Sequence, residues 1–372
     1  MAVGETEMNM RTADVLVIGG GIAGIGAAAH IAADADVIVL ERETATGTHS
    51  TGRSAAIFVL NYGNGTLRAL NAASEPVFRD PGALSDLPLL TPRGELLLAG
   101  EGEADLLEET LGSASGMVRL TPEEAAEIVP AVRREGLIGA VYERDASDID
   151  VDLLLGGFVR LLRARGGQIV TGAEAQAITR VGGVWRIETP AGVFEAPVVV
   201  NAAGAWADAV AARAGVRGVG LQPMRRSAAL IPQPEGAADW PLFGSLREDW
   251  YAKPQSGKLM VSPADEDPVE PQDAWPDDMV LAEGIDRFER MTTLQVTRVE
   301  RTWAGLRSFT GDRTPVAGFA PDGQGFFWLA GQGGYGIQTA PALSTLTADL
   351  VAGRAPALDA EIVAALSPER FA

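Results

Sequence analysis

Three closely spaced glycines offer the first candidate chemistry in this 372-residue chain. Gly19-x-Gly21-x-x-Gly24 follows a short apolar run and precedes an alanine-rich stretch. In such a turn the first glycine permits a tight bend and the second lets a pyrophosphate approach the backbone. The third lets the following helix pack closely on the strand, and the amides at the start of that helix attract phosphate oxygens. Because the chain has 44 glycines, the motif alone is a weak signal.

The elements around these glycines strengthen the signal. Residues 13–19 and 36–40 are apolar runs typical of strands buried on both faces, and the stretch between them predicts a helix. The second strand ends at Glu41, 17 residues beyond Gly24, close to the ~20 at which a carboxylate meets a ribose hydroxyl. A carboxylate there disfavours the 2′-phosphate of NADP. The sequence therefore predicts a βαβ dinucleotide site, with a glycine turn that binds nothing as the alternative.

Composition removes several other chemistries. The net charge of −20 disfavours nucleic acid and anionic membranes as partners. With no cysteine, disulfides, iron–sulfur clusters, thiolate metal sites and a cysteine nucleophile are excluded. His30 and His49 are the only histidines, so no metal site is expected, and Lys253 and Lys258 leave few candidates for a Schiff base. No apolar stretch reaches the ~18 residues of a spanning helix, so we expect a soluble cytoplasmic protein.

Four further segments carry a family resemblance. A polar loop containing HSTGRSAA occupies residues 49–56, NAAGAW occupies 201–206, TWAGLRSF occupies 302–309, and GGYGIQT occupies 333–339. With these segments the chain resembles the D-amino acid oxidase superfamily of FAD-dependent amine oxidoreductases. Within it, and with LQP-x-RRSA at 221–228, the chain is similar to the bacterial D-arginine dehydrogenase subfamily.

The resemblance implies FAD as the cofactor, held non-covalently, with a link through His49 as the alternative. A helix that begins near Gly333 would direct its N-terminus at the flavin. The residues that the resemblance places at the cofactor are Gly19, Gly21, Ile22, Ala23, Gly24, Glu41, Arg42, Ser50, Thr51, Arg53, Ser54, Ala55, Ala56, Glu174, Ala175, Ala203, Gly204, Trp206, Gly305, Arg307, Gly333, Gly334, Tyr335, Gly336, Ile337 and Gln338.

It also implies a clamp for a substrate carboxylate. Arg226 and Arg307 match the family's clamp positions, and the planar fork of arginine suits a carboxylate. Tyr251 matches a tyrosine that covers this carboxylate. Surface ion pairs for the arginines and plain packing for the tyrosine are the alternatives.

The remaining catalytic candidates surround the reacting amine. The resemblance places His49 near the amine and the flavin edge, gives the amine the backbone carbonyl of Gly334, and puts Gln338 in the pocket. Glu95 matches the position where a carboxylate meets a basic side chain, and an exposed strand-edge glutamate is the alternative. Ile57, Phe58, Leu242 and Gly244 depart from the subfamily's pattern, which leaves a strict preference for arginine open.

The leading hypothesis is oxidative deamination of D-amino acids, basic or large ones such as D-arginine favoured. Hydride transfer from Cα to flavin N5 would give an imine that hydrolyses to a 2-oxo acid and ammonium. An oxidase of glycine, sarcosine or another small amine that uses O₂ is one alternative, and a non-catalytic or tRNA-modifying flavoprotein of the same fold is another. We expect the substrate to be a small-molecule amino acid. The electron acceptor, a quinone or another, and the oligomeric state stay open.

The expected architecture is α/β combined with α+β. A discontinuous Rossmann-like FAD-binding domain would comprise residues 12–85, 143–220 and 305–372. A substrate-binding domain on a largely antiparallel sheet would be inserted as residues 86–142 and 221–304, and residues 1–11 would be disordered. Within the insert, residues 264–290 read as an acidic, solvated loop.

Overall fold

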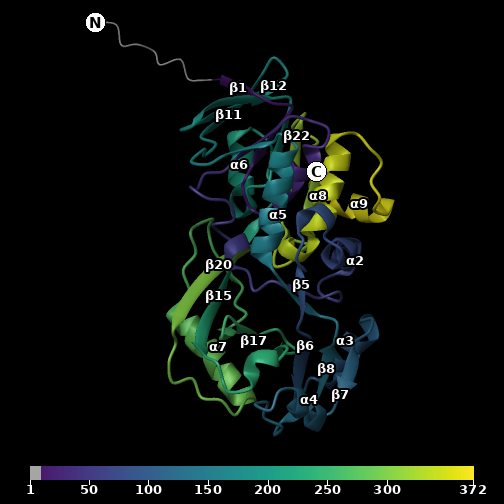
Figure 1. Ribbon diagram of the computed structural model, residues 1–372, viewed down its shortest axis with the longest axis vertical. Coiled ribbons are helices and arrows are strands. Elements are labelled where there is room, and N and C mark those ends of the chain that lie inside the picture. Colours follow the sequence, from purple (N-terminus) through teal and green to yellow (C-terminus); the bar gives the residue numbers. More distant parts are fainter. Residues whose placement is uncertain (1–9) are drawn as a thin grey trace, which may run out of the picture.

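The computed structural model describes residues 10–372 (Figure 1). Most of the terminal segment expected to be disordered, residues 1–9, lies outside the described residues. For Met10 and Arg11 the expectation is wrong, because both belong to strand β1 (Met10–Thr12). That strand pairs in parallel with β13 (Gly192–Ala196), a partner too distant in sequence for local patterns to reveal.

A six-stranded sheet follows the expected nucleotide-binding pattern. Its order is β10-β3-β2-β14-β22-β21, and every pair is parallel except β21 with β22. Every residue of the first two strands of the βαβ unit is buried, as the apolar runs predicted. The strands are β2 (Val15–Ile18), β3 (Val37–Leu40), β10 (Gln168–Val170), β14 (Val198–Asn201), β21 (Val316–Phe319) and β22 (Phe326–Ala330).

Different elements cover the two faces of this sheet. On one face α1 (Ile22–Ile31), α5 (Val151–Ala164) and α8 (Gly336–Val351) share a core with Val15 and Val17. On the other face Leu16 and Ile18 pack with α6 (Ala207–Arg213) and with a four-stranded sheet. That sheet has the order β1-β13-β12-β11 and includes β11 (Ala177–Val181) and β12 (Val184–Thr189).

A nine-stranded sheet forms the other half of the molecule. Its order is β19-β15-β18-β17-β16-β6-β8-β7, with β20 also paired to β15. Only the β6–β16 pair is parallel, so the predicted largely antiparallel sheet is confirmed. The strands are β6 (Glu95–Gly100), β7 (Val118–Leu120), β8 (Leu137–Glu143), β15 (Gln222–Pro232), β16 (Leu242–Ser245), β17 (Tyr251–Gln255), β18 (Lys258–Ser262), β19 (Asp267–Pro268) and β20 (Arg301–Phe309).

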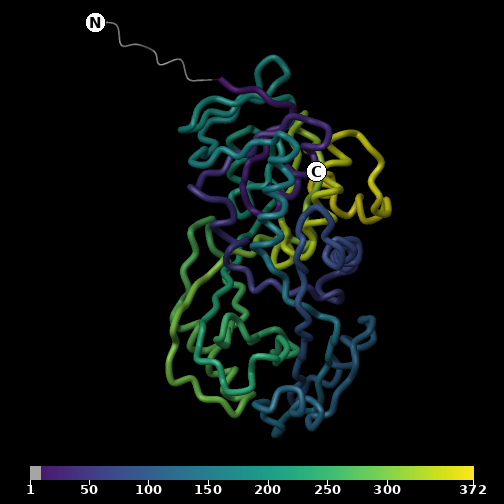
Figure 2. The backbone as a smooth tube through the Cα atoms, in the orientation of Figure 1, coloured from purple at the N-terminus to yellow at the C-terminus, as the bar shows by residue number. Residues whose placement is uncertain are grey.

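Two separate stretches of chain build this sheet. Figure 2 shows the blue segment after residue 90 and the green segment after residue 221 entering the same lower part of the molecule. They join where β6 pairs with β16, with Glu95 opposite Leu242. The expected boundary at 304/305 falls within β20, whose pairing with β15 continues to Phe309. We therefore propose the same two domains as expected from the sequence, except that the whole of β20 belongs to the domain of the nine-stranded sheet.

The acidic stretch 264–290 was expected to be a loop, but half of it is helical. Helix α7 (Asp278–Met291) begins after Asp277, whose carboxylate accepts hydrogen bonds from the Met279 and Val280 amides. Leu281, Gly284 and Phe288 are buried, and their spacing of three and four residues marks one helical face. The abundance of acidic residues hid this periodicity.

Small elements connect the two halves. A three-stranded antiparallel sheet of β4 (Ile57–Phe58), β9 (Ser147–Ile149) and β5 (Leu90–Pro92) lies at the junction. The other helices are α2 (Gly65–Arg79), α3 (Ala104–Ser113), α4 (Pro122–Ile128) and α9 (Ala360–Leu366). Short 3₁₀ turns are η1 (Thr51–Arg53), η2 (Gly82–Leu84), η3 (Gly204–Trp206), η4 (Ala237–Asp239) and η5 (Pro368–Phe371). Within residues 10–372 no helix combines the length and apolar character needed to cross a membrane.

Candidate active site

The glycine turn has the close contacts that the motif requires. Gly19 has φ +114°, and a Cβ on it would lie 2.3 Å from the Ala202 carbonyl oxygen. A Cβ on Gly24 would lie 2.0 Å from the Gly19 carbonyl oxygen. Only glycine fits at either position, because real Cβ atoms do not approach backbone oxygens so closely. The turn thus brings the start of α1 directly onto the ends of β2 and β14.

Two side chains fix this turn from outside. Glu41, at the end of β3, accepts hydrogen bonds from the Gly20 amide at 2.6 Å and from the Glu43 amide at 2.8 Å. Thr51 Oγ1 accepts one from the Ile22 amide at 3.1 Å. The Glu41 carboxylate is anchored where a ribose hydroxyl can still reach its remaining lone pairs.

One cavity of about 710 Å³ begins at this turn and extends to the nine-stranded sheet. All the residues expected at the cofactor and substrate line it except Gly24, which acts only through packing against Gly19. The lining includes Gly19, Gly21, Ile22, Ala23, Glu41, Arg42, His49, Ser50, Thr51, Arg53, Ser54, Ala55, Ala56, Glu95, Glu174, Ala175, Ala203, Gly204, Trp206, Arg226, Tyr251, Gly305, Arg307, Gly333, Gly334, Tyr335, Gly336, Ile337 and Gln338.

Several polar atoms in the cavity wall lack partners. Among the described residues, His49 Nδ1, Gln332 Nε2 and Gln338 Nε2 are buried without a hydrogen bond. All three side chains belong to residues that line the cavity. Buried polar groups normally find a partner, so the wall is suited to a polar occupant. Gln338 Oε1 is already fixed, because it accepts a hydrogen bond from the Val59 amide at 3.1 Å.

His49 lies with the residues that follow β3. Its Nε2 is 2.9 Å from Glu43 Oε1, and its ring packs on Trp206 with centroids 4.8 Å apart. The Arg42 guanidinium stacks on the same indole at 4.6 Å. These contacts favour a place beside the ribose carboxylate, and the expected role next to the substrate amine stays a prediction.

Arg307, on β20, lines the part of the cavity that the nine-stranded sheet forms. Its Nη1 donates a hydrogen bond to the Tyr62 hydroxyl at 3.3 Å, and no carboxylate of the described chain lies within salt-bridge distance of it. A Cβ on Gly334 would be 2.8 Å from its guanidinium carbon, so glycine allows the arginine to lie flat on that backbone. Burial alone would lower the pKa of Arg307, but the oxygens of Tyr62 and Tyr251 raise it. The guanidinium therefore stays charged.

The pKa values of two tyrosines beside this guanidinium are shifted in opposite directions. Burial raises the pKa of Tyr62 to about 12, which keeps its hydroxyl protonated. Burial also acts to raise the pKa of Tyr251, but the positive charges of Arg307 and Arg226 outweigh it, so the pKa is lowered. Both hydroxyls can donate to an anion bound at Arg307. With Tyr335, three of the chain's four tyrosines line this cavity.

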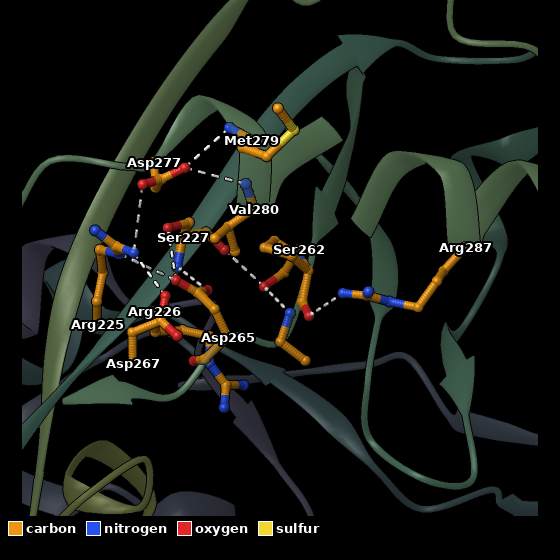
Figure 3. Close-up of polar contacts among 12 residues, drawn as sticks. Arg225, Arg226, Ser227, Ser262, Asp265, Asp267, Asp277, Met279, Val280 and Arg287 are labelled. Atoms are coloured by element: carbon orange, nitrogen blue, oxygen red, sulfur yellow. Dashed lines mark hydrogen bonds and ion pairs between the residues drawn. The ribbon is translucent and has the colours of Figure 1, made fainter. Parts of the chain in front are cut away.

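Arg226 lines the cavity and its neighbour Arg225 does not; Figure 3 shows the two side chains pointing in different directions. Arg226 Nε donates to the Asp265 carbonyl oxygen at 2.8 Å, and its Nη2 lies 3.1 Å from Glu266. The Asp265 carboxylate accepts from the Ser227 amide at 2.6 Å and the Ser227 hydroxyl at 2.8 Å. This buried network fixes the 265–266 loop against β15, and the loop holds Arg226.

Glu95 is a further charged candidate in the cavity wall. It begins β6 and lines the cavity, and burial, with smaller contributions from Glu143 and Glu248, raises its pKa to about 8. The Glu143 carboxylate already has partners, because it accepts hydrogen bonds from the Leu60 amide at 2.9 Å and from Asn61 Nδ2 at 2.7 Å. Glu95 is therefore a cavity carboxyl, not an exposed strand-edge residue.

Sequence reasoning missed several residues of this site. Tyr62 and Arg313 line the cavity, and Glu266 joins Arg226 to Arg313, which it meets at 2.9 and 3.0 Å. Glu143 positions the loop that carries Tyr62. The scarcity of tyrosine in the composition was the only available signal for Tyr62, and the others depend on contacts between distant segments.

Comparison with known proteins agrees with this geometry. A family model described as FAD dependent oxidoreductase (DAO) matches residues 14–350, and the chain belongs to this family. The protein therefore uses FAD, and the glycine turn, the anchored Glu41 and the unpartnered polar atoms fit that group. The superfamily expected from the motifs is confirmed, whereas the D-arginine dehydrogenase subfamily is not shown.

The relatives cover the chain to different extents. Mitochondrial sarcosine dehydrogenase of Homo sapiens is 28% identical over 88% of this chain, and the match spans only 38% of that longer protein. Glycine oxidase of Bacillus licheniformis is 26% identical, and the match covers 91% of this chain and 93% of that one.

Solved structures confirm the fold. Glycine oxidase from Geobacillus kaustophilus has a TM-score of 0.82 at 24% identity, covering 95% of this chain and 98% of its own. L-proline dehydrogenase from P. horikoshii has a TM-score of 0.83 at 22% identity, covering 98% of both chains. At these identities the likeness establishes the shared architecture alone.

Proposed function

We propose that this protein oxidises the amine of a small amino acid, of the glycine or N-methylglycine class, with FAD as the electron acceptor within the site. The observation that carries the proposal is Arg307, a cation in the cavity wall with no carboxylate partner among the described residues and with tyrosine hydroxyls beside it. A buried unpaired charge is costly, and a substrate carboxylate would neutralise it. The near-complete mutual coverage with a glycine oxidase supports the small-amine class over D-amino acids.

The residues suggest a division of labour. Arg307 would bind the carboxylate, and the hydroxyls of Tyr62 and Tyr251 would donate to it and fix its orientation. FAD, when bound, supplies the oxidising power by accepting two electrons. The substrate would lose a hydride from the carbon next to nitrogen and a proton from the amine, so that a C=N bond forms. Hydrolysis of this imine then gives a carbonyl compound and the freed amine.

A second candidate is the oxidation of D-amino acids with a basic side chain. Glu95 favours it, because a cation would stabilise the ionised form of this cavity carboxyl. Leu242 lies opposite Glu95 on the paired strand and also lines the cavity, as does Ile57. Leu242 offers a cationic side chain no polar partner, which agrees with the main proposal, whose substrates have no charged side chain.

Anaerobic bleaching of the yellow FAD-loaded protein tests the proposal. We expect glycine or sarcosine to reduce the flavin faster than D-arginine, D-lysine, D-alanine or L-proline does. Replacing Arg307 with Met should weaken this reduction by at least about 100-fold, since a charge-assisted clamp of about 3 kcal/mol is lost, while FAD stays bound.

Two outcomes contradict parts of the proposal. If Arg307→Met is reduced by the substrate as fast as the native protein, Arg307 does not bind the substrate carboxylate. Bleaching by D-arginine that is much faster than by glycine, and that is lost in Glu95→Gln, would favour the second candidate. The electron acceptor is then identified by comparing two rates, peroxide formation in air and turnover with a quinone.

A further inference from the structure

A group of three charged side chains joins the cavity wall to the nine-stranded sheet, outside the residues that line the cavity. Asp148, on β9, accepts a hydrogen bond from Lys253 Nζ at 2.6 Å and one from Arg93 Nε at 2.7 Å. Lys253 Nζ also donates to the Ala55 carbonyl oxygen at 2.6 Å. The Lys253 side chain is only 6% exposed, and those of Arg93 and Asp148 are 14% and 19% exposed. We call these three residues the junction triad.

The backbone that the triad holds is conformationally unusual. Ser54, Ala55 and Ala56 all line the cavity, and Ala56 has φ +41°, in the left-handed region that a residue with a Cβ rarely adopts. Such a conformation persists only where its surroundings enforce it. Here two consecutive carbonyl oxygens are held, that of Ala55 by Lys253 and that of Ala56 by the Ile149 amide at 3.0 Å.

The triad also ties this segment to the rest of the nine-stranded sheet. Lys253 stands on β17, two residues from Tyr251, and Arg93 precedes β6. Arg93 Nη1 donates to the Ala238 and Trp240 carbonyl oxygens at 2.9 and 3.0 Å. The position of the 54–56 segment is therefore coupled to the strand that carries a substrate-facing tyrosine.

The charges of the triad do not cancel. Two cations share one carboxylate, which leaves one positive charge in a largely buried place behind the cavity wall. An excess positive charge favours negative charge nearby, and reduction by two electrons is the process that increases negative charge on a flavin. The triad can thus act on the cofactor in two ways. It positions the 54–56 segment, and the electric field of its excess positive charge stabilises negative charge on the flavin.

We propose that Lys253 is a positioning residue for FAD, which holds the 54–56 segment against the cofactor and raises the midpoint potential of the bound flavin. Lys253 does not line the cavity and touches no reacting atom. The inference rests on FAD binding and is independent of which amine is the substrate.

The test compares Lys253→Met with Lys258→Met in the full chain. Lys258, the only other lysine, forms a more exposed ion pair with Glu300 at 2.7 Å and serves as the matched control. The FAD dissociation constant is measured by flavin fluorescence on adding FAD to stripped protein, and the midpoint potential by redox titration. In Lys253→Met we expect at least about tenfold weaker FAD binding, a loss of about 1.4 kcal/mol, and a more negative potential. Lys258→Met should match the native protein in both.

Asp148→Asn separates the field from mere structural support. It removes a negative charge, so it should shift the midpoint potential in the positive direction, opposite to Lys253→Met. A midpoint potential that falls in both variants, or changes in neither, would overturn the proposed effect of the triad's charge on the flavin. An unchanged dissociation constant in Lys253→Met would overturn the positioning role. If Lys253→Met does not fold, Lys253→Gln is measured in its place with the same expectations.

Discussion

The protonation state of Glu95 decides what the cavity offers a substrate. The carboxyl is neutral over most of the physiological range, because burial raises its pKa to about 8. In this state it can donate a hydrogen bond but does not attract a cation. A small zwitterion bound at Arg307 would not require Glu95 to ionise, whereas a substrate with a guanidinium side chain would.

Glu95 should therefore leave a signature in the pH dependence of stability. Its pKa in the folded protein, about 8, lies above the ordinary value of 4.5 that applies to the unfolded chain. A raised pKa contributes stability below the unfolded value, and this stability is lost as pH rises through the folded value. We expect the Tm of the native protein to fall between pH 5 and pH 9 more steeply than that of Glu95→Gln, as measured by calorimetry in parallel buffers. Parallel curves for the two proteins would contradict the raised pKa.

At the scale of elements, the glycine turn is a matter of packing between β2, α1 and β14. Ala202, which follows β14, contacts the turn, and a Cβ on Gly24 would overlap the Gly19 carbonyl oxygen at 2.0 Å. An alanine inside a helix normally stabilises it by about 0.5–1 kcal/mol relative to glycine. At Gly24 the overlap makes alanine destabilising instead, because the turn must open to admit the methyl group.

We expect Gly24→Ala to lower the free energy of unfolding by about 1–3 kcal/mol and to weaken FAD binding. Gly112, within α3, is the matched control, because a Cβ there meets nothing within 4 Å. Gly112→Ala should raise the free energy of unfolding slightly and leave FAD affinity unchanged. Urea titration and flavin fluorescence measure the two quantities, and equal effects of both substitutions would refute the packing argument.

The same scale shows what the sequence could predict. The βαβ unit was predictable, because its strands, glycines and Glu41 lie within about 30 residues and each follows a local pattern. The contact of Tyr62 with Arg307 joins residues 245 positions apart, and the hydrogen bond from the Leu60 amide to Glu143 joins residues 83 positions apart. Side-chain chemistry around Arg307 is set by such distant pairings, which no local period encodes.

At the scale of the whole molecule, the two large sheets have separate cores. Val17 and Ile25 belong to the core of the six-stranded sheet, and Phe243 and Trp250 to that of the nine-stranded sheet. The junction between them is partly apolar, because Phe309 of β20 belongs to the core of the six-stranded sheet and Leu306 packs with Ala205. It is also partly polar, as in the bond from the Ser50 hydroxyl to the Leu306 carbonyl oxygen at 2.7 Å. Because hydrogen bonds contribute only about 0.5–1.5 kcal/mol each, the polar contacts add little to the coupling that these apolar contacts provide.

FAD should strengthen this coupling, because residues from both sheets line its cavity. A ligand at 100 times its dissociation constant stabilises the folded state by about 2.7 kcal/mol, which corresponds to a rise in Tm of roughly 3–4 °C for a chain of this length. We expect calorimetry of the stripped protein to show a lower Tm and a transition broader than two-state unfolding, since the two sheets have different main cores. Added FAD should raise the Tm and sharpen the transition into one. A stripped protein that already melts in a single sharp step would mean that the junction suffices, without FAD, to make the two sheets one cooperative unit.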